Sequence, residues 1–134
     1  MDDANVPSLI SLPYLDGGSG ELNATLYAAT RRWVLSRRNE YYYCGANATD
    51  ACGVGSPHTQ PSMVWPMGLL TAALTARSAK EVVGLVELLL ETDDGTDLMH
   101  ESLNLDRPSE FTRPWFDWCA ATAPSPLTRR SKLE

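Results

Sequence analysis

Glu101 is the residue with the clearest potential for chemistry, and it follows His100 in the segment Gly-Thr-Asp-Leu-Met-His-Glu-Ser of residues 95–102. This segment lies just past the end of a predicted helix. A glutamate on such a loop can act as a general base, because the helix fixes where the loop begins while the loop reaches into a cleft. An isolated loop glutamate is more often solvated than catalytic, so the neighbouring motifs decide the interpretation.

Metal binding is the first alternative, and the spacing of the candidate ligands argues against it. Asn104 stands four residues after His100, where a zinc-binding helix needs its second histidine. Cys44, Cys52 and His58 match no standard zinc spacing. The two cysteines can instead close a disulfide across the short loop between them in an oxidising compartment, or stay reduced. We therefore expect no metal and no cofactor.

Length and charge limit the class of protein. The 134 residues are 43% hydrophobic and 21% charged, which is typical of one soluble globular domain. The net charge of −6, with 11 basic and 17 acidic residues, and the lack of a basic stripe exclude nucleic acid as a partner. The longest uncharged run, residues 59–76, contains two prolines and several polar residues, so no membrane span is predicted.

Two glycosylation sequons bear on the cellular compartment. They are Asn23-Ala-Thr25 and Asn47-Ala-Thr49. Together with the cysteine pair, they favour a parent protein in the secretory pathway or outside the cell. Met1 is followed by two aspartates instead of a basic and then apolar stretch, so no signal peptide is predicted. We interpret this mismatch as a sign that the front of the parent protein is missing.

Four helices are predicted to position these groups, and apolar periodicity indicates the first two. Residues 21–37 form the first. Its expected apolar stripe consists of Leu22, Leu26, Ala29, Trp33 and Val34. Residues 63–76 form the second, with Pro66 tolerated because it falls in the first turn.

The third and fourth helices are predicted from their start signals. A capping box from Ser78 to Glu81 opens the third, and Thr92-Asp-Asp-Gly95 ends it. Apolar residues surround most of this helix, as expected of one that is buried between neighbours. Thr112 is predicted to cap the fourth helix, with Pro114 in its first turn.

The remaining sequence is predicted to form loops and a tail. Residues 38–62 and 92–111 form long loops, which usually carry function in a compact domain. Residues 40–43 are the one stretch expected to pair briefly as a strand. Residues 122–134 are polar and contain proline, as is typical of a frayed tail. The expected fold class is therefore all-α.

Five segments together resemble glycoside hydrolase family 125, the exo-α-1,6-mannosidases. They occur in the family's order within residues 1–119, as residues 1–9, 41–43, 53–59, 91–101 and 111–118. The resemblance implies part of an (α/α)6 barrel of the six-hairpin type, with about four helices and long active-site loops. On this basis residues 1–121 are the C-terminal part of the catalytic domain, and residues 122–134 are the tail.

The resemblance also implies metal-independent hydrolysis of terminal α-1,6-linked mannose with inversion, and a mannose-containing oligosaccharide or N-glycan as substrate. Glu101 corresponds to the family's general base. Asp3, Asn5 and His58 correspond to positions near the sugar, and we expect His100 to contact substrate or to help keep Glu101 ionised. In the family the general acid is an aspartate upstream of the first matching segment, so this chain lacks it.

Inversion needs two carboxyl groups roughly 6.5–9.5 Å apart, one to activate water and one to protonate the leaving oxygen. A chain with only one of them is predicted to be inactive alone. Trp65, Trp115 and Trp118 could stack on a sugar ring, but core packing is favoured for them, and Cys119 is expected to be a buried structural thiol. The alternatives are a non-catalytic helical fragment that binds sugar or another polypeptide, and a truncated gene model that does not fold.

Overall fold

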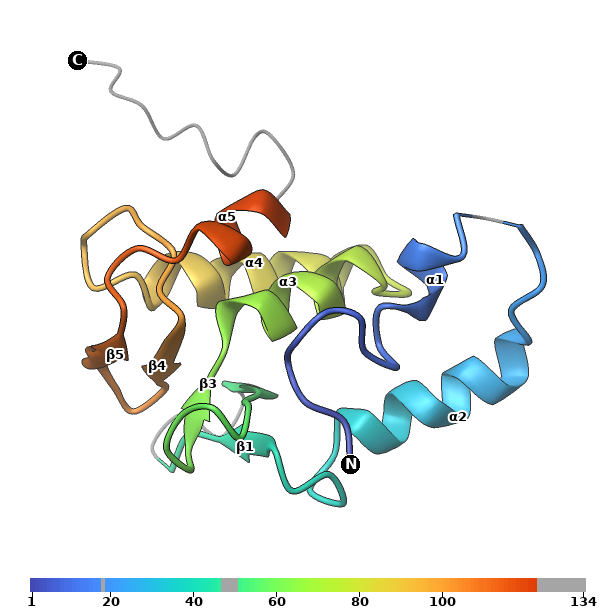
Figure 1. The fold of residues 1–134 in the computed structure, drawn as a ribbon, viewed down its shortest axis with the longest axis horizontal. Helices are drawn as coiled ribbons and strands as arrows, with labels where there is room; N and C mark the ends of the chain where they lie inside the picture. Colours follow the sequence, from blue (N-terminus) through green and yellow to red (C-terminus); the bar gives the residue numbers. More distant parts are fainter. Residues whose placement is uncertain (18, 47–50, 123–134) are drawn as a thin grey trace, which may run out of the picture.

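The computed structural model describes residues 1–17, 19–46 and 51–122. Five helices and five strands follow one another within these residues (Figure 1). In chain order they are α1 (Leu12–Leu15), α2 (Ala24–Val34), β1 (Tyr42–Cys44), β2 (Cys52–Val54), β3 (Met63–Val64), α3 (Pro66–Leu74), α4 (Ala79–Glu91), β4 (Ser102–Asn104), β5 (Arg107–Thr112) and α5 (Asp117–Thr122). The predicted tail lies outside the described residues from residue 123 onward.

The fold is mixed α/β, so the prediction of an all-α class was wrong. Two antiparallel sheets are present, one formed by β1 and β2 and the other by β3, β4 and β5 in that order. Both sheets arise largely within the stretches that were predicted to be loops. The strands are only 2–6 residues long, which is too short to give the alternating pattern that identifies a strand in sequence.

The β1–β2 sheet brings the glycine-rich residues 53–55 against the core. Tyr42 pairs with Val54, and β1 overlaps the stretch predicted to pair briefly. A Cβ on Gly55 would collide with the main-chain oxygen of Met63, so only glycine allows this close approach of β2 to β3. The backbone of this segment is thus held against the neighbouring strand.

The β4–β5 hairpin occupies most of the predicted second loop. Ser102 pairs with Thr112, and Leu103 pairs with Phe111. The turn is stabilised by the side chain of Asn104, whose Oδ1 accepts a hydrogen bond of 3.0 Å from the N–H of Asp106. The hairpin therefore fixes the residues on either side of it.

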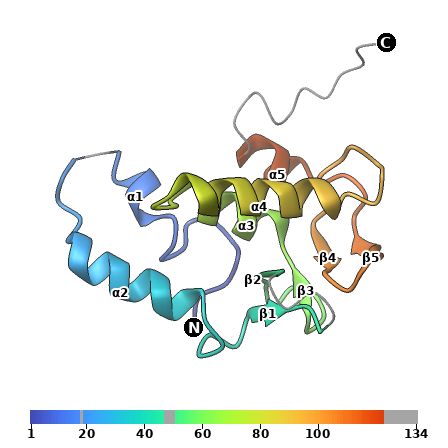
Figure 2. The ribbon, with the colours of Figure 1, turned by 180° about the vertical axis from the view of Figure 1, so that it is seen from behind.

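Helix α3 is the buried centre of the structure. Pro66 occupies its first turn as predicted, and seven of its residues, from Pro66 to Ala72, are buried. Figures 1 and 2 show α4 beside α3, α5 at the end of α3 and the two sheets on the other side. The predicted helix began three residues too early, because Met63 and Val64 form β3.

Helix α4 is amphipathic and partly open to solvent, so the prediction of a helix buried between neighbours was wrong. Its capping box is present, since Ser78 Oγ accepts from Glu81 N at 3.2 Å. One face packs on α3, while Val83 is 52% exposed and none of the helix residues is fully buried. The helix ends at Glu91, before Gly95 as predicted.

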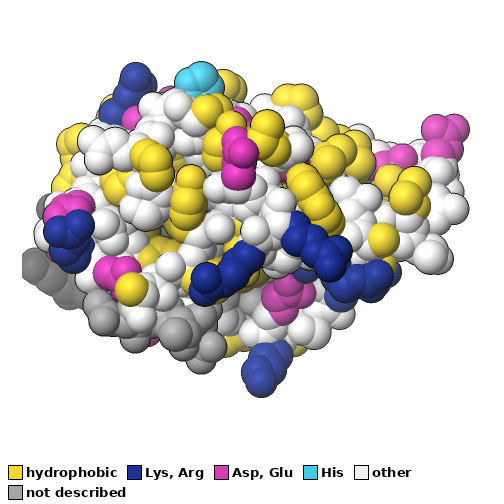
Figure 3. Space-filling view, turned by 90° about the horizontal axis from the view of Figure 1, so that it is seen from below, with side chains coloured by type: hydrophobic (Ala, Val, Ile, Leu, Met, Phe, Trp, Pro, Cys, Tyr) yellow, Lys and Arg dark blue, Asp and Glu magenta, His cyan; other side chains and the backbone are white. Residues whose placement is uncertain are grey.

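Helix α2 buries only part of the predicted stripe, namely Val34 and, in part, Trp33. Leu26 is 67% exposed, whereas Tyr27, Arg31 and Val34 are buried. Tyr27 turns inward because its hydroxyl donates to the carbonyl oxygen of Ile10 at 2.8 Å. Viewed from below, the surface carries apolar side chains among basic and acidic ones (Figure 3).

A buried ion pair joins three helices. Arg31 on α2 donates from Nη2 to the carbonyl oxygen of Ala72 on α3 at 2.9 Å. Its Nη1 lies 2.7 Å from Oε1 of Glu81 on α4. The Nε of Arg31 is buried and has no hydrogen-bond partner within the part of the chain that the structure describes. The capping glutamate of α4 thus also neutralises a charge in the core.

The fourth predicted helix was misplaced. Thr112 ends β5, and α5 begins five residues later at Asp117. The chain turns between them at Arg113, which has a positive φ of 46°. Among the described residues, no helix is long and apolar enough to cross a membrane.

Candidate functional site

The β4–β5 hairpin holds Glu101 by both its main chain and its side chain. The N–H of Glu101 donates to the carbonyl oxygen of Thr112 at 3.0 Å. Thr112 Oγ1 donates to Glu101 Oε2 at 3.0 Å, and Arg113 Nε lies 3.5 Å from Oε1. The Glu101 side chain is 14% exposed. The carboxylate is therefore largely shielded but still accessible to solvent, and it is not on a free loop.

His100 fills the space beneath this hairpin. Its ring is 1% exposed and stacks on Phe111, with centroids 3.8 Å apart and planes 3° apart. Nδ1 lies 2.9 Å from the carbonyl oxygen of Pro114, and Nε2 lies 3.2 Å from that of Asp93. Because carbonyl oxygens only accept hydrogen bonds, the ring must donate at least one. Both nitrogens thus lie close to main-chain oxygens of the protein, and these contacts fix His100 next to Glu101 in the chain.

Residues 1–9 and the glycine-rich residues 53–59 meet in one polar cluster, which consists of Asp3, Asn5, Ser56 and His58. Asp3 Oδ1 accepts from Asn5 N at 2.9 Å, and Asp3 Oδ2 accepts from Asn5 Nδ2 at 3.1 Å. Asn5 Nδ2 is also 3.1 Å from Ser56 Oγ, which donates to Asp3 Oδ2 at 3.4 Å. The N–H of Ala4 donates to the carbonyl oxygen of Gly55 at 2.9 Å. Two segments about 50 residues apart are thus brought together.

His58 is the exposed member of this cluster. Its main-chain N–H donates to Ser56 Oγ at 3.3 Å. Its ring centroid lies 6.3 Å from that of Trp65, which is buried and donates from Nε1 to Thr59 Oγ1 at 2.9 Å. The imidazole therefore faces solvent while a rigid indole supports the turn that carries it.

A row of side chains connects the cluster to Glu101. Trp65 meets Phe116 edge to face, with centroids 5.8 Å apart. The guanidinium of Arg113 lies 5.6 Å from the Phe116 centroid, and Arg113 also contacts the Glu101 carboxylate. The exposed His58 of the polar cluster thus lies at one end of the row, and Glu101 lies at the other.

The remaining tryptophans and the free thiol have different environments. Trp65 packs in the core as expected, but Trp115 and Trp118 are exposed, so core packing was the wrong expectation for these two. Burial raises the pKa of the Cys119 thiol to about 12. A nucleophilic cysteine must be a thiolate, so Cys119 is a structural thiol, as expected.

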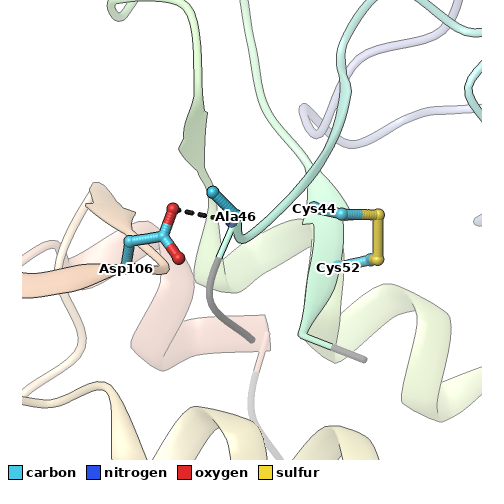
Figure 4. The surroundings of a disulfide bond; sticks show 4 residues. All are labelled: Cys44, Ala46, Cys52 and Asp106. Atoms are coloured by element: carbon cyan, nitrogen blue, oxygen red, sulfur yellow. Dashed lines mark hydrogen bonds between the residues drawn. A yellow bond between two sulfur atoms is a disulfide. The ribbon is translucent and has the colours of Figure 1, made fainter. Parts of the chain in front are cut away.

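Cys44 and Cys52 form a disulfide between paired positions of β1 and β2 (Figure 4). Beside it, the N–H of Ala46 donates to Asp106 Oδ2 at 2.8 Å, which joins the end of β1 to the turn of the β4–β5 hairpin. In the part of the chain that the structure describes, no three histidine, cysteine, aspartate or glutamate side chains are grouped to hold a metal ion.

Two cavities lie apart from these groups. One of about 320 Å³ lies between α2, α3, α4 and the β1–β2 sheet, and Leu35, Leu85 and Glu81 are among its lining residues. The other, of about 170 Å³, lies beside Cys44 and Arg107. Neither of these two cavities is lined by Glu101 or by the polar cluster.

Sequence reasoning missed several residues that organise the site. Ser56 and Arg113 lie within the matching segments 53–59 and 111–118. Sequence spacing did not indicate that their side chains would contact Asp3 and Glu101. Asp2 was also missed: its carboxylate accepts from the N–H of Leu9 at 3.1 Å and closes the N-terminal turn. Burial raises the pKa of Asp2 despite these hydrogen bonds. No periodic signal marks such contacts, because they join loops.

Comparisons with known proteins identify a family and two relatives. The model of a family described as metal-independent alpha-mannosidase, glycoside hydrolase family 125, matches residues 1–124. The meiotically up-regulated gene 157 protein of Schizosaccharomyces pombe (strain 972 / ATCC 24843) is 43% identical over 118 residues, which are 88% of this chain and 22% of that protein. A solved Streptococcus pneumoniae structure, from work on metal-independent alpha mannosidases and in a non-productive complex with alpha-1,6-mannobiose, has a TM-score of 0.80 at 41% identity. It is matched over 91% of this chain and 28% of its own length, so the chain spans about a quarter of the length of these relatives.

Proposed function

The chain belongs to glycoside hydrolase family 125, the metal-independent alpha-mannosidases, and from this premise we propose that it carries the water-activating part of an inverting exo-α-1,6-mannosidase. Glu101 is the general base in this proposal. The substrate is a terminal α-1,6-linked mannose of an oligosaccharide or N-glycan. The complex of the Streptococcus pneumoniae relative with alpha-1,6-mannobiose supports the choice of linkage.

The surroundings of Glu101 carry the proposal. A general base must be oriented and must reach water, and Glu101 meets both needs through its bond to Thr112 and its partial exposure. The guanidinium of Arg113 lies beside the other oxygen of the same carboxylate, with Nε 3.5 Å from Oε1, and so helps to orient it. The contacts of the His100 ring fix the main chain just before Glu101.

Sugar recognition is assigned to the polar cluster. Asp3 and Asn5 present fixed oxygen and nitrogen atoms, and the exposed His58 ring can bond a hydroxyl group. Asp3 accepts hydrogen bonds on both oxygens, which suits an acceptor better than a proton donor. The general acid is therefore assigned to a part of the family's domain that these 134 residues do not supply, and we expect this chain alone not to hydrolyse mannosides.

One observation favours a second candidate, a non-catalytic fragment that associates with sugar or polypeptide. Trp115 and Trp118 on the α5 side, and Val83 on α4, present large apolar groups to solvent. Such groups suit an interface. Both candidates predict sugar contact, but only the first predicts that Glu101 matters for turnover.

The test uses a chimera in which this chain replaces the matching segment of the Streptococcus pneumoniae relative. Hydrolysis of alpha-1,6-mannobiose is measured for the chimera and for its Glu101→Gln variant, with mannobiose binding measured separately. We expect the variant to lose about 10²–10⁴-fold in kcat while it keeps binding. Glu110→Gln is the matched control, because Glu110 lies on the same hairpin and is exposed. Near-normal turnover in Glu101→Gln removes this residue from the mechanism.

A further inference from the structure

One sequence motif has no part in the proposed hydrolysis, the sequon Asn23-Ala-Thr25 at the start of α2. Asn23, Ala24 and Thr25 are all exposed. The start of α2 lies at the edge of the molecule, far from the two sheets (Figures 1 and 2). A bulky group on Asn23 would therefore extend into solvent without displacing the core.

Among the described residues, the side chain of Asn23 uses one of its two polar atoms in a hydrogen bond. Its Oδ1 accepts a hydrogen bond of 2.9 Å from the N–H of Leu26 and caps the helix. Its Nδ2 makes no bond that the cap needs. Glycosylation joins Nδ2 to a sugar and leaves Oδ1 as an acceptor, so the modified residue can still cap α2.

The disulfide is an independent indication of the compartment. Cys44 and Cys52 are joined across the β1–β2 sheet, and disulfides persist where the environment is oxidising. The lumen of the secretory pathway is such an environment, and N-glycosylation belongs to secreted proteins. Both features thus require the same location for the chain.

We propose that Asn23 is an N-glycosylation site whose modified side chain still caps α2. The donor is an oligosaccharide linked through diphosphate to a lipid. Asn23 Nδ2 forms a bond to the anomeric carbon, the bond from that carbon to the diphosphate oxygen breaks, one proton leaves the nitrogen and the lipid diphosphate departs. No oxidant or reductant is needed. The proposal does not depend on the function of Glu101.

The experiment expresses the full chain behind a cleavable secretory leader in yeast and measures the intact mass before and after treatment with a peptide-N-glycosidase. Thr49→Ala is present throughout, because it removes the second sequon, which lies outside the described residues. In this background we expect one glycan, and its enzymatic removal should convert Asn23 to aspartate. Thr25→Ser should retain the glycan, since serine preserves the sequon.

Two variants separate modification from folding. Thr25→Ala removes the sequon but keeps the Asn23 cap, and Asn23→Asp removes the acceptor nitrogen but keeps a good capping residue. Both should lose the glycan and melt at about the temperature of the deglycosylated chain. A translocated chain, shown by its protection from added protease, that carries an unmodified Asn23 overturns the proposal. Failure of the chain to enter the lumen behind the leader also counts against it, because the acceptor must reach the donor.

Discussion

The hydroxyl of Thr112 links the carboxylate of Glu101 to the β4–β5 sheet. It donates to Glu101 Oε2 at 3.0 Å and lies 2.7 Å from Ser102 Oγ, its paired position on β4. The register of the hairpin therefore determines where the carboxylate points. Because a base must hold its orientation while water approaches, this bond connects sheet geometry to the proposed chemistry.

Replacing Thr112 with valine should impair turnover more than binding. The change keeps the shape of the side chain but removes the donor to Glu101, and we expect kcat of the chimera to fall about tenfold with little change in KM, which corresponds to about 1.4 kcal/mol. Steady-state kinetics on alpha-1,6-mannobiose measure this effect. Thr112→Ser keeps the hydroxyl and should retain most of the activity. Equal kcat values for the two variants would show that the bond does not position the base.

The Arg31–Glu81 pair should respond unequally to removal of its two members. Glu81→Gln leaves the buried guanidinium without its counter-charge, and we expect the free energy of unfolding to fall by about 2 kcal/mol, since Glu81 is partly hydrated. Arg31→Met removes the charge and the unsatisfied Nε together but also the bond to the Ala72 carbonyl oxygen, so its cost should be about 1 kcal/mol and smaller than that of Glu81→Gln. Urea denaturation of each variant measures these changes. Arg32→Met, a change at the exposed neighbour, is the control and should be nearly neutral.

The disulfide should stabilise the folded chain mainly by restricting the conformations of the unfolded chain. Cys44 and Cys52 are eight residues apart, and closing a loop of this size restricts the unfolded chain by about 2–3 kcal/mol. We expect the double change of Cys44 and Cys52 to alanine to lower the free energy of unfolding by that amount. Reduction should lower the stability of the wild-type chain similarly and leave the variant unchanged. A reductant effect of equal size in both proteins would assign the loss to another cause.

Asp2 should make stability depend on acid pH. Burial raises the pKa of Asp2 above 3.8, so the folded chain holds this proton more tightly than the unfolded chain does. The resulting stabilisation is complete below the unfolded pKa and is lost as the pH rises through the folded pKa. Asp2→Asn keeps an oxygen for the N–H of Leu9 and does not titrate. Thermal unfolding at about pH 3 and about pH 6 should therefore show the variant gaining stability relative to wild type as the pH rises. A constant difference would exclude this linkage.

Helices α3 and α4 could be predicted from sequence because their signals are local, whereas α1 was not predicted and α5 was misplaced. The capping box at Ser78 and the proline at position 66 act within one turn, and both are found where expected. The sheets could not be predicted, because each short strand is stabilised by a partner elsewhere in the chain. Burial was also misjudged for α2, where the bond from Tyr27 to Ile10 and the buried Arg31 select a face that hydrophobicity does not indicate.

The candidate site was predictable only to the level of its motifs. The resemblance selected Asp3, Asn5 and His58, and the structure joins their segments through Ser56. The resemblance gave no indication that the hydroxyl of Thr112 on β5 would hydrogen-bond to Glu101, because that contact depends on the register of the hairpin. Side-chain contacts between loops have no sequence periodicity, so they emerge only from the folded chain.

The His100 ring contacts the main-chain carbonyl groups of Asp93 and Pro114, and this affects which sequence changes the chain should tolerate. Since main-chain oxygen is common to every amino acid, replacing the side chain at position 93 or 114 leaves both acceptors available. The length of chain between each acceptor and the ring is what must be conserved. An insertion or deletion between residue 93 and His100, or between His100 and residue 114, should therefore be tolerated less well than a change of side chain at position 93 or 114.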